Sequence, residues 1–240
     1  MKIPFLLIIR YGLYISIFSF LLVGDSCKII SNPTSIVPEK NIPVESIFFD
    51  TIVKDIDGNS YPVIQIGNQL WMTSNLRVSR YKTGKPISQK QGNSINGNIE
   101  EEGRFVWYQN NEDNELTYGK LYNYYVIMGG CLCPEGWHVP AVEEWQQMID
   151  YLGVTDNAGI ILQADTGINF YNELGGIMIP ENILSPFSDI NKAGYWWTNT
   201  SVGRNTVADY ELHLGKLQVI RGSVSEGAFL SVRCIKNISK

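Results

Sequence analysis

The stretch CPEGWHVPAVEEWQQMIDYLG, residues 133–153, carries the strongest helical pattern in the chain. Four apolar residues on it recur at spacings of three and four and therefore share one helix face: Trp145, Met148, Ile149 and Leu152. Pro140 suits the helix entrance and Gly153 suits its C-cap, while two glutamates lie in the first turn. We expect an amphipathic helix whose apolar stripe packs into a core.

Strand-forming segments flank this helix on both sides. Before it, Ile47–Ile56 and Ser60–Ile66 are rich in β-branched and aromatic residues, and Asp-Gly-Asn between them is a turn signal. Gln69–Met72 continues this meander. After the helix, short strands are expected at residues 195–197, 208–214, 216–221 and 228–235. This order predicts an α+β domain whose terminal strands meet in one antiparallel sheet.

A second, shorter helix is predicted over residues 118–128. Its apolar residues at helical spacing are Leu121, Tyr124, Tyr125 and Met128, and two glycines follow as a stop signal. The domain is therefore expected to hold two main helices among short antiparallel strands.

Residues 1–26 have the pattern of an export signal. Tyr11–Val23 is a run of thirteen uncharged residues, whereas a membrane span needs about twenty. The run ends in Gly-Asp-Ser-Cys27, which is similar to a lipobox, although its first two residues depart from the usual pattern. We expect acylation of Cys27 after cleavage, with ordinary secretion and an uncleaved anchor as the alternatives.

The composition supports one exported domain on a tether. Residues 27–45 contain three prolines and no hydrophobic period, so they are expected to link the acylated cysteine to a single domain at residues 46–238. The formal net charge is −5 and no run of Lys or Arg occurs, which disfavours a nucleic-acid partner. The partner expected for the anchor is a membrane of the cell envelope, with the outer membrane as the expected location and the domain on its periplasmic side or its outer surface.

Blocks of aromatic, glycine and cysteine residues follow one another in an order known from a bacterial family. They are Asp55–Asn59, Ile66–Met72, Asn75-Leu76, Trp107-Tyr108, Tyr118–Tyr125, Cys133–Pro140, Glu144-Trp145, Gly194–Trp197 and Ser231–Cys234. Together they resemble the Fibrobacter succinogenes major paralogous domain. The resemblance implies a C-type-lectin-like fold and an exported or lipid-anchored protein of Bacteroidetes or related bacteria, and it implies no defined activity.

The sequence departs from this family at the start of the main helix. Ala141 stands where relatives usually have Thr or Ser, so a side-chain cap worth about 1 kcal/mol is missing. Ile177 and Met178 also replace the aromatic residue and the arginine that usually follow Gly175-Gly176.

The cysteine count predicts one disulfide. Once Cys27 is assigned to the anchor, three cysteines remain for an oxidising compartment, which makes one pair and one spare. The family resemblance implies the pair Cys133–Cys234, with Cys131 as the competitor of Cys133. No metal site is expected, because Cys131, Cys133 and His138 do not supply four well-spaced zinc ligands.

Ligand contacts are expected from one exposed aromatic ring. Strand alternation sends the rings of Trp196 and Trp197 to opposite faces, so we expect one of them to be exposed and to contact a ligand. No cofactor is expected. Asn110–Glu115 offers oxygens that suit calcium but lacks the spacing of an EF-hand loop.

These features favour a non-catalytic surface binding or adhesion module with a glycan or surface-protein ligand. The tether and the long polar stretch Thr83–Gly103 support this interpretation, and the sequence contains no recognisable nucleophile motif. The alternatives are an enzyme related to formylglycine-generating oxidases and a structural subunit of an envelope assembly.

Overall fold

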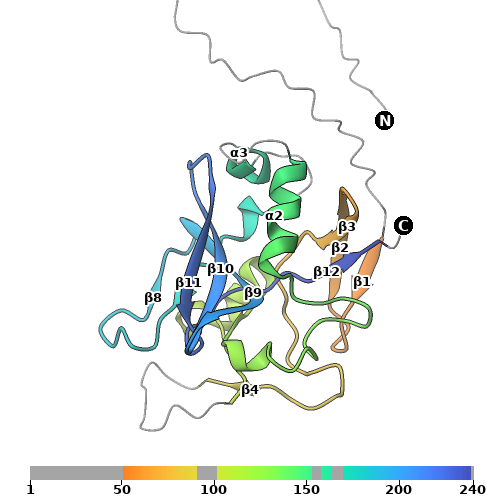
Figure 1. The fold of residues 1–240 in the computed structure, drawn as a ribbon. Coiled ribbons are helices and arrows are strands. Elements are labelled where there is room, and N and C mark those ends of the chain that lie inside the picture. The colour runs from red at the N-terminus through yellow and green to blue at the C-terminus, as the bar shows by residue number, and fades with distance from the viewer. Residues whose placement is uncertain (1–50, 91–101, 153–157, 164–169, 239–240) are drawn as a thin grey trace, which may run out of the picture. The chain divides into compact units, whose positions relative to one another are not determined.

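The computed structural model describes residues 51–90, 102–152, 158–163 and 170–238 (Figure 1). The chain divides into two units, residues 1–40 and 41–240, and all described residues belong to the second. The predicted signal peptide 1–26, the tether 27–45 with Cys27, and the predicted C-cap Gly153 lie outside the described residues.

The first sheet joins the beginning and the end of the domain. Its four strands, in spatial order, are β1 (Ile52–Lys54), β2 (Ser60–Ile66), β3 (Gln69–Met72) and β12 (Ile235–Asn237), and all neighbours are antiparallel. Gly58 and Gly67 occupy the turns with positive φ, a conformation that glycine adopts without strain. The predicted meander and the meeting of terminal strands in one antiparallel sheet are both confirmed.

The second sheet carries the longest strands. Its spatial order is β11 (Val219–Ser225), β10 (Thr206–His213) and β9 (Ala193–Gly203), again antiparallel. The remaining described strands form two smaller sheets. One consists of β4 (Ser88–Gln89), β5 (Arg104–Val106) and β6 (Leu121–Tyr122), and the other consists of β7 (Ile177–Met178) and β8 (Phe187–Ser188). Few helices and many antiparallel strands make this an α+β domain.

The described helices are short. They are α1 (Glu115–Tyr118), α2 (Val142–Tyr151) and α3 (Ala158–Gln163), with 3₁₀ turns at Tyr108–Asn110, Glu112–Asn114, Tyr124–Val126 and Tyr171–Glu173. The predicted helix after Pro140 is confirmed as α2, with Trp145, Met148 and Ile149 buried. Within the described part of the chain, no helix has the length and apolar character needed to cross a membrane.

The helix predicted over residues 118–128 is wrong. Helix α1 ends at Gly119, whose φ of 75° is left-handed, and an added Cβ there would lie 2.7 Å from the Cβ of Asn75. Leu121 and Tyr122 instead pair with Val106 and Phe105 as strand β6. Pairing with a distant strand therefore overrides the helical spacing of these residues.

Helix α2 packs between the first two sheets. In Figure 1 it lies with β9–β11 on one side and β1–β3 on the other, and one core cluster combines residues from all three: Ile64, Ile66, Trp71, Val142, Trp145, Met148, Trp196, Ala208 and Tyr210. The Trp145 ring stacks on Tyr210 at 4.9 Å and meets Trp71 edge-on at 5.0 Å. Such aromatic pairs contribute beyond their buried area.

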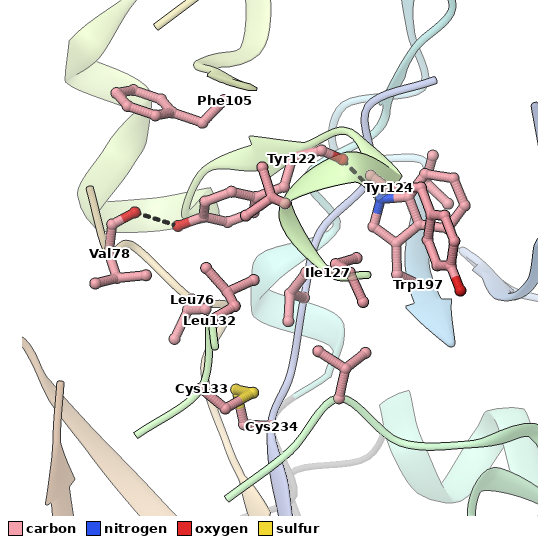
Figure 2. Close-up of a cluster of buried hydrophobic side chains, with 14 of the residues drawn as sticks. Leu76, Val78, Phe105, Tyr122, Tyr124, Ile127, Leu132, Cys133, Trp197 and Cys234 are labelled. Atoms are coloured by element: carbon pink, nitrogen blue, oxygen red, sulfur yellow. Dashed lines mark hydrogen bonds between the residues drawn. A yellow bond between two sulfur atoms is a disulfide. The ribbon is translucent and has the colours of Figure 1, made fainter. Parts of the chain in front are cut away.

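A second core cluster surrounds Tyr122 and Trp197 (Figure 2). The Tyr122 hydroxyl donates to the carbonyl of Val78 at 2.8 Å, and the Trp197 indole N–H donates to the carbonyl of Tyr122 at 2.6 Å. Both polar atoms are therefore satisfied inside an apolar environment, as buried donors require.

The C-terminal segment, residues 229–237, pairs with a strand of each of the four sheets. Phe229 bridges to Met178, Leu230 to Tyr122, and Ser231 to Trp196, before β12 pairs with β3. Residues 231–235 of this segment are fully buried. The C-terminal segment is thus a central structural element and not a peripheral one.

Candidate functional site: an acidic notch at strand β11

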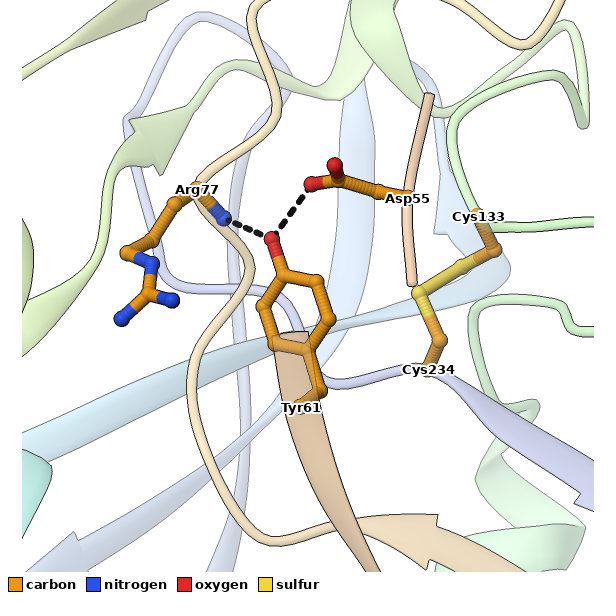
Figure 3. Close-up of a disulfide and its surroundings, with 5 residues drawn as sticks. All are labelled: Asp55, Tyr61, Arg77, Cys133 and Cys234. Carbon is orange, nitrogen blue, oxygen red and sulfur yellow. Dashed lines mark hydrogen bonds between the residues drawn. A yellow bond between two sulfur atoms is a disulfide. The ribbon is translucent and has the colours of Figure 1, made fainter. Parts of the chain in front are cut away.

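The predicted disulfide is present. Cys133 and Cys234 are bonded, with 6.0 Å between their Cα atoms, so the loop before α2 is linked to the buried C-terminal segment (Figure 3). The alternative partner, Cys131, is a half-buried free thiol. The pairing with Cys133 is therefore confirmed.

Asp55 organises the turn near this disulfide (Figure 3). Its carboxylate accepts hydrogen bonds from the backbone of Asp57 and Asn59, both at 2.9 Å, and from the Tyr61 hydroxyl at 2.6 Å. The Tyr61 oxygen in turn accepts from the backbone N–H of Arg77 at 3.0 Å. Burial, followed by the contact with Asp55, raises the pKa of Tyr61 far above its ordinary value. This block is a structural network.

Arg233 is the most deeply buried cation of the described residues, at 0% exposure. Its Nε donates to the side-chain oxygen of Asn75 at 3.1 Å, which also accepts from the Trp196 indole at 2.8 Å. The guanidinium lies 3.8 Å from the centre of the Phe170 ring, and its Nη2 lies 3.8 Å from the Glu173 carboxylate. Glu173 also accepts from the Asn75 backbone.

Burial governs the titration of this buried network. It lowers the pKa of Arg233 to about 10, although Glu173 opposes the shift. It also raises the pKa of Glu173, although Arg233 and the Asn75 N–H oppose that shift. Each charge thus has its counter-charge inside the protein, and the network joins Asn75 to the C-terminal segment.

The expectation that one ring of the Trp196-Trp197 pair is exposed is wrong. Trp196 is 1% exposed and Trp197 is 0% exposed. The rings do point to opposite faces of β9, but each face carries a core cluster, so both rings are buried. Neither ring offers a free surface for a ligand in this structure.

Strand β9 replaces the missing cap of helix α2. The Thr200 hydroxyl accepts a hydrogen bond from the Val142 N–H at 3.1 Å, and the Glu144 carboxylate accepts from the Ala141 N–H at 2.8 Å. Burial alone would raise the pKa of Glu144, but its hydrogen bonds, including one with His138, lower it. The alanine that departs from the family pattern is thus compensated by a distant residue.

Two of the side chains proposed for calcium in Asn110–Glu115 have oxygens that already make internal contacts. Asn111 accepts from the Asp113 N–H at 3.1 Å, and Glu115 accepts from the Trp107 indole at 2.7 Å and from Lys120 at 3.3 Å. Across the residues that the structure describes, no group of three His, Cys, Asp or Glu side chains is arranged to hold a metal ion. These residues stabilise the start of α1.

A small cavity lies beside the disulfide. Cys133, His138 and Asn199 are among the residues that line it, and its volume is ≈ 60 Å³. Small-molecule sites usually have volumes of about 300–1,000 Å³. This cavity has room for water molecules but not for a sugar ring.

Two carboxylates converge on a glycine in the edge strand of the second sheet. Asp209 faces Gly222 directly across the β10–β11 ladder, and Glu211 lies two residues further on the same face. A Cβ built on Gly222 would lie 2.5 Å from Glu211 Oε1 and 2.9 Å from Asp209 Oδ1. Glycine therefore leaves room for both carboxylates where they lie, whereas a larger residue would require them to shift. We call Asp209, Glu211 and Gly222 the acidic notch.

Asp209 is buried without a matching positive charge. It is 2% exposed, and its Oδ1 makes no hydrogen bond. Burial, and then repulsion from Glu211, raises the pKa of Asp209 to about 7. A buried polar atom without a partner costs about 1–3 kcal/mol, so the notch is an energetically unsatisfied site.

Polar groups on the same face border the notch. His213 Nε2 lies 2.8 Å from Glu211 Oε2, and the Tyr195 hydroxyl donates to Asp189 at 3.0 Å. Burial, and then its contact with Asp189, raises the pKa of Tyr195 above its ordinary value. Arg221 belongs to the other face, where it lies across the ladder from Tyr210.

The family comparison identifies the scaffold around these groups. The model of the Fibrobacter succinogenes major domain matches residues 64–236, more than half of the chain. The chain belongs to this family. No curated protein and no solved structure matches the chain.

Within the Fibrobacter succinogenes major domain, the blocks that carry the resemblance build the scaffold. Asn75, Trp196 and Arg233 form the buried network, and Cys133 and Cys234 form the disulfide. The acidic notch lies outside all of these blocks. Sequence reasoning missed it, although acidic residues alternate along the predicted strand 208–214; the position of Gly222 opposite them depends on strand register.

Proposed function

We propose that the protein is an exported, non-catalytic binding module that Cys27 anchors to the cell envelope, on the outer membrane. We further propose that its domain has a C-type-lectin-like fold. Few helices, antiparallel strands and a first sheet that joins both ends of the domain support this fold.

The disulfide supports export. Disulfides persist in oxidising compartments and are rare in reducing ones, and Cys133–Cys234 fastens the buried segment on which all four sheets depend. An exported location supplies the conditions under which this bond forms.

The acidic notch carries the proposal of a binding role. An unsatisfied buried carboxylate at the edge of a sheet is stabilised when a partner supplies a donor or a positive charge. A protein ligand fits this chemistry better than a neutral glycan. The oxidase alternative is less well supported, because Cys133 is bonded to Cys234 and does not form a reactive pair with Cys131.

Metabolic labelling with a fatty-acid analogue tests the anchor. The full chain should incorporate the label, and Cys27→Ala should lose both the label and membrane fractionation. Cys131→Ala is the matched control and should keep both. Labelling that persists in Cys27→Ala refutes acylation at this residue.

A glycan and protein array tests the binding role. The full chain purified in detergent should bind protein ligands reproducibly, and Asp209→Asn should weaken that binding. Turnover of a candidate substrate, without reproducible binding to any ligand, would reverse the order of the binding and enzyme hypotheses.

A further inference from the structure

We propose that strand β11 is a docking edge for an extended basic segment of a protein partner, which adds a strand and places one Lys or Arg side chain in the acidic notch. This inference rests on the binding role proposed above and specifies the chemistry of the ligand. Three independent features carry it: the unpaired edge, the unsatisfied carboxylate and the apolar flanks.

The edge of β11 is available for pairing. Strand β11 is the end strand of its sheet, it spans seven residues, and the structure gives it no neighbour other than β10 among the described residues. An edge strand presents unpaired N–H and C=O groups along its outer side. Extended peptides bind such edges through main-chain hydrogen bonds.

The ladder register shows which residues of β11 face outward. The Glu226 N–H donates to the Asn205 carbonyl at 3.2 Å, which identifies this pair as a hydrogen-bonded one. Because pairs alternate along an antiparallel ladder, Gly222 also directs its backbone groups toward β10. The backbone groups of Arg221 and Ser223 therefore point outward, toward an added strand.

This register brings a partner side chain to the notch. A residue of the added strand that lies opposite Gly222 occupies a non-hydrogen-bonded pair, in which side chains on one face approach most closely. Gly222 has no side chain to obstruct it, and the oxygens of Asp209 and Glu211 already lie over this position. A Lys or Arg at this point meets both carboxylates.

Charge selects the occupant. Oδ1 of Asp209 is buried without a hydrogen bond, and Glu211 adds a second negative charge nearby. A cationic side chain supplies the missing donor and the missing counter-charge together. His213 contacts Glu211 from the same strand, while Oδ1 of Asp209 stays buried without a hydrogen bond.

The flanks of the notch set the neighbouring positions of the ligand. Ile220 and Val224 lie two residues on either side of Gly222 and share its face. Ile220 is 43% exposed, and Val224 is partly buried against the core. A ligand with apolar residues two positions before and after its Lys or Arg therefore fits this edge.

A second copy of the chain fits the edge less well. Pairing of β11 with another β11 would bring Ile220, Gly222 and Val224 to the notch face, and none of these carries a positive charge. Arg221 points to the opposite face. Self-association would therefore leave the carboxylates of the notch without a cation.

The experiment compares four heptapeptides on the full chain in detergent at pH 8. The peptides have the sequence Thr-Val-Thr-X-Thr-Val-Thr with capped ends, where X is Lys, Arg, Gln or Glu, and binding is followed by fluorescence anisotropy. The Lys and Arg peptides should bind at least about tenfold more tightly than the Gln peptide, and the preference should weaken as salt is added.

Two variants separate the backbone from the charges. Ser223→Pro removes an outward N–H at an edge position where proline is tolerated, so it should abolish binding of all peptides, while Ser223→Ala should retain it. Asp209→Asn combined with Glu211→Gln should remove the preference for Lys and Arg. Circular dichroism and the thermal midpoint verify that each variant is folded.

Several results would overturn the docking proposal. These are no binding by any of the four peptides, equal binding of the Lys and Gln peptides, or unchanged binding in a folded Ser223→Pro variant. A dimer in sedimentation that Ser223→Pro dissociates would identify a second copy as the occupant and also overturn it. If array ligands bind Asp209→Asn more weakly but bind Ser223→Pro unchanged, only this inference fails; if no ligand binds at all, the proposed binding role fails with it.

Discussion

Two buried charges in this domain have opposite surroundings. Arg233 is 0% exposed and is enclosed by Asn75, Glu173 and the ring of Phe170. Asp209 is 2% exposed, and its charged neighbour Glu211 has the same sign. The first charge is compensated by the fold, whereas the second is not.

This difference assigns a structural role to Arg233 and a ligand-binding role to Asp209. Removing one partner of a buried ion pair is strongly destabilising, so a compensated charge holds its neighbours in place. An uncompensated charge weakens the fold and gains most from an external partner. The opposite effects of neutralising Arg233 and Asp209 are therefore the most direct measure of the two roles.

Arg233→Met should have the largest effect. It leaves Glu173 buried without its cation, so the free energy of unfolding should fall by about 3–5 kcal/mol. Urea denaturation measures the change. The exposed Arg221→Met is the matched control and should change stability by less than about 0.5 kcal/mol. Similar losses in both variants would contradict the assigned role of Arg233.

Loss of the disulfide should follow in size. The double variant Cys133→Ser/Cys234→Ser should lose about 2–5 kcal/mol, because the unfolded chain regains the freedom that the bond removes. The comparison is made by urea denaturation without reductant. Cys131→Ser keeps the bond and should remain close to the parent protein; an equal loss there would indicate that Cys131 takes part in the pairing.

Asp209→Asn should act in the opposite direction. Burial raises the pKa of Asp209 from 3.8 to about 7, so between these pH values the folded state holds a proton that the unfolded state has released. Stability contributed by this group is present below about pH 4 and is lost as the pH rises toward 7. The variant should lack this loss and exceed the parent by about 1–3 kcal/mol at pH 8.

Urea denaturation from pH 4 to pH 8 measures this effect. Glu135→Gln, at an exposed carboxylate, is the control and should leave the profile unchanged. A loss of stability in Asp209→Asn at pH 8 would show that the carboxylate is compensated like Arg233.

Thr200→Val should have the smallest effect. It removes the oxygen that accepts from the Val142 N–H while it keeps the shape of the side chain, so the domain should lose about 1 kcal/mol. Thermal unfolding measures the change, and Thr200→Ser should restore most of the loss. No difference between Val and Ser would mean that water caps the helix instead.

Local patterns predicted the elements whose residues decide their own conformation. Ser60–Ile66 and Gln69–Met72 form strands with the expected bounds, and α2 has the expected buried stripe. The Cys133–Cys234 pair was implied by the family resemblance, because cysteine spacing alone left Cys131 as an alternative. In these cases short-range periodicity or a motif shared with the family was sufficient to predict the element or the disulfide.

Elsewhere the same kind of pattern was misleading. The helical spacing over residues 118–128 gives way to strand β6, since pairing with β5 and the close approach of Gly119 to Asn75 override it. Strand alternation correctly separated the rings of Trp196 and Trp197 but did not reveal that both faces of β9 are covered. Burial depends on what packs against a face, which periodicity does not describe.

The amino-acid sequence was sufficient for the α+β class, the family and the main helix, because periodicity, turn residues and colinear motifs are written along the chain. The acidic notch and the cap from Thr200 arise only when distant segments meet. Gly222 accommodates two carboxylates because the β10–β11 register places it opposite Asp209, and Thr200 replaces the hydroxyl that Ala141 lacks. Contacts of this kind are set by strand register and packing, which are properties of the folded chain as a whole.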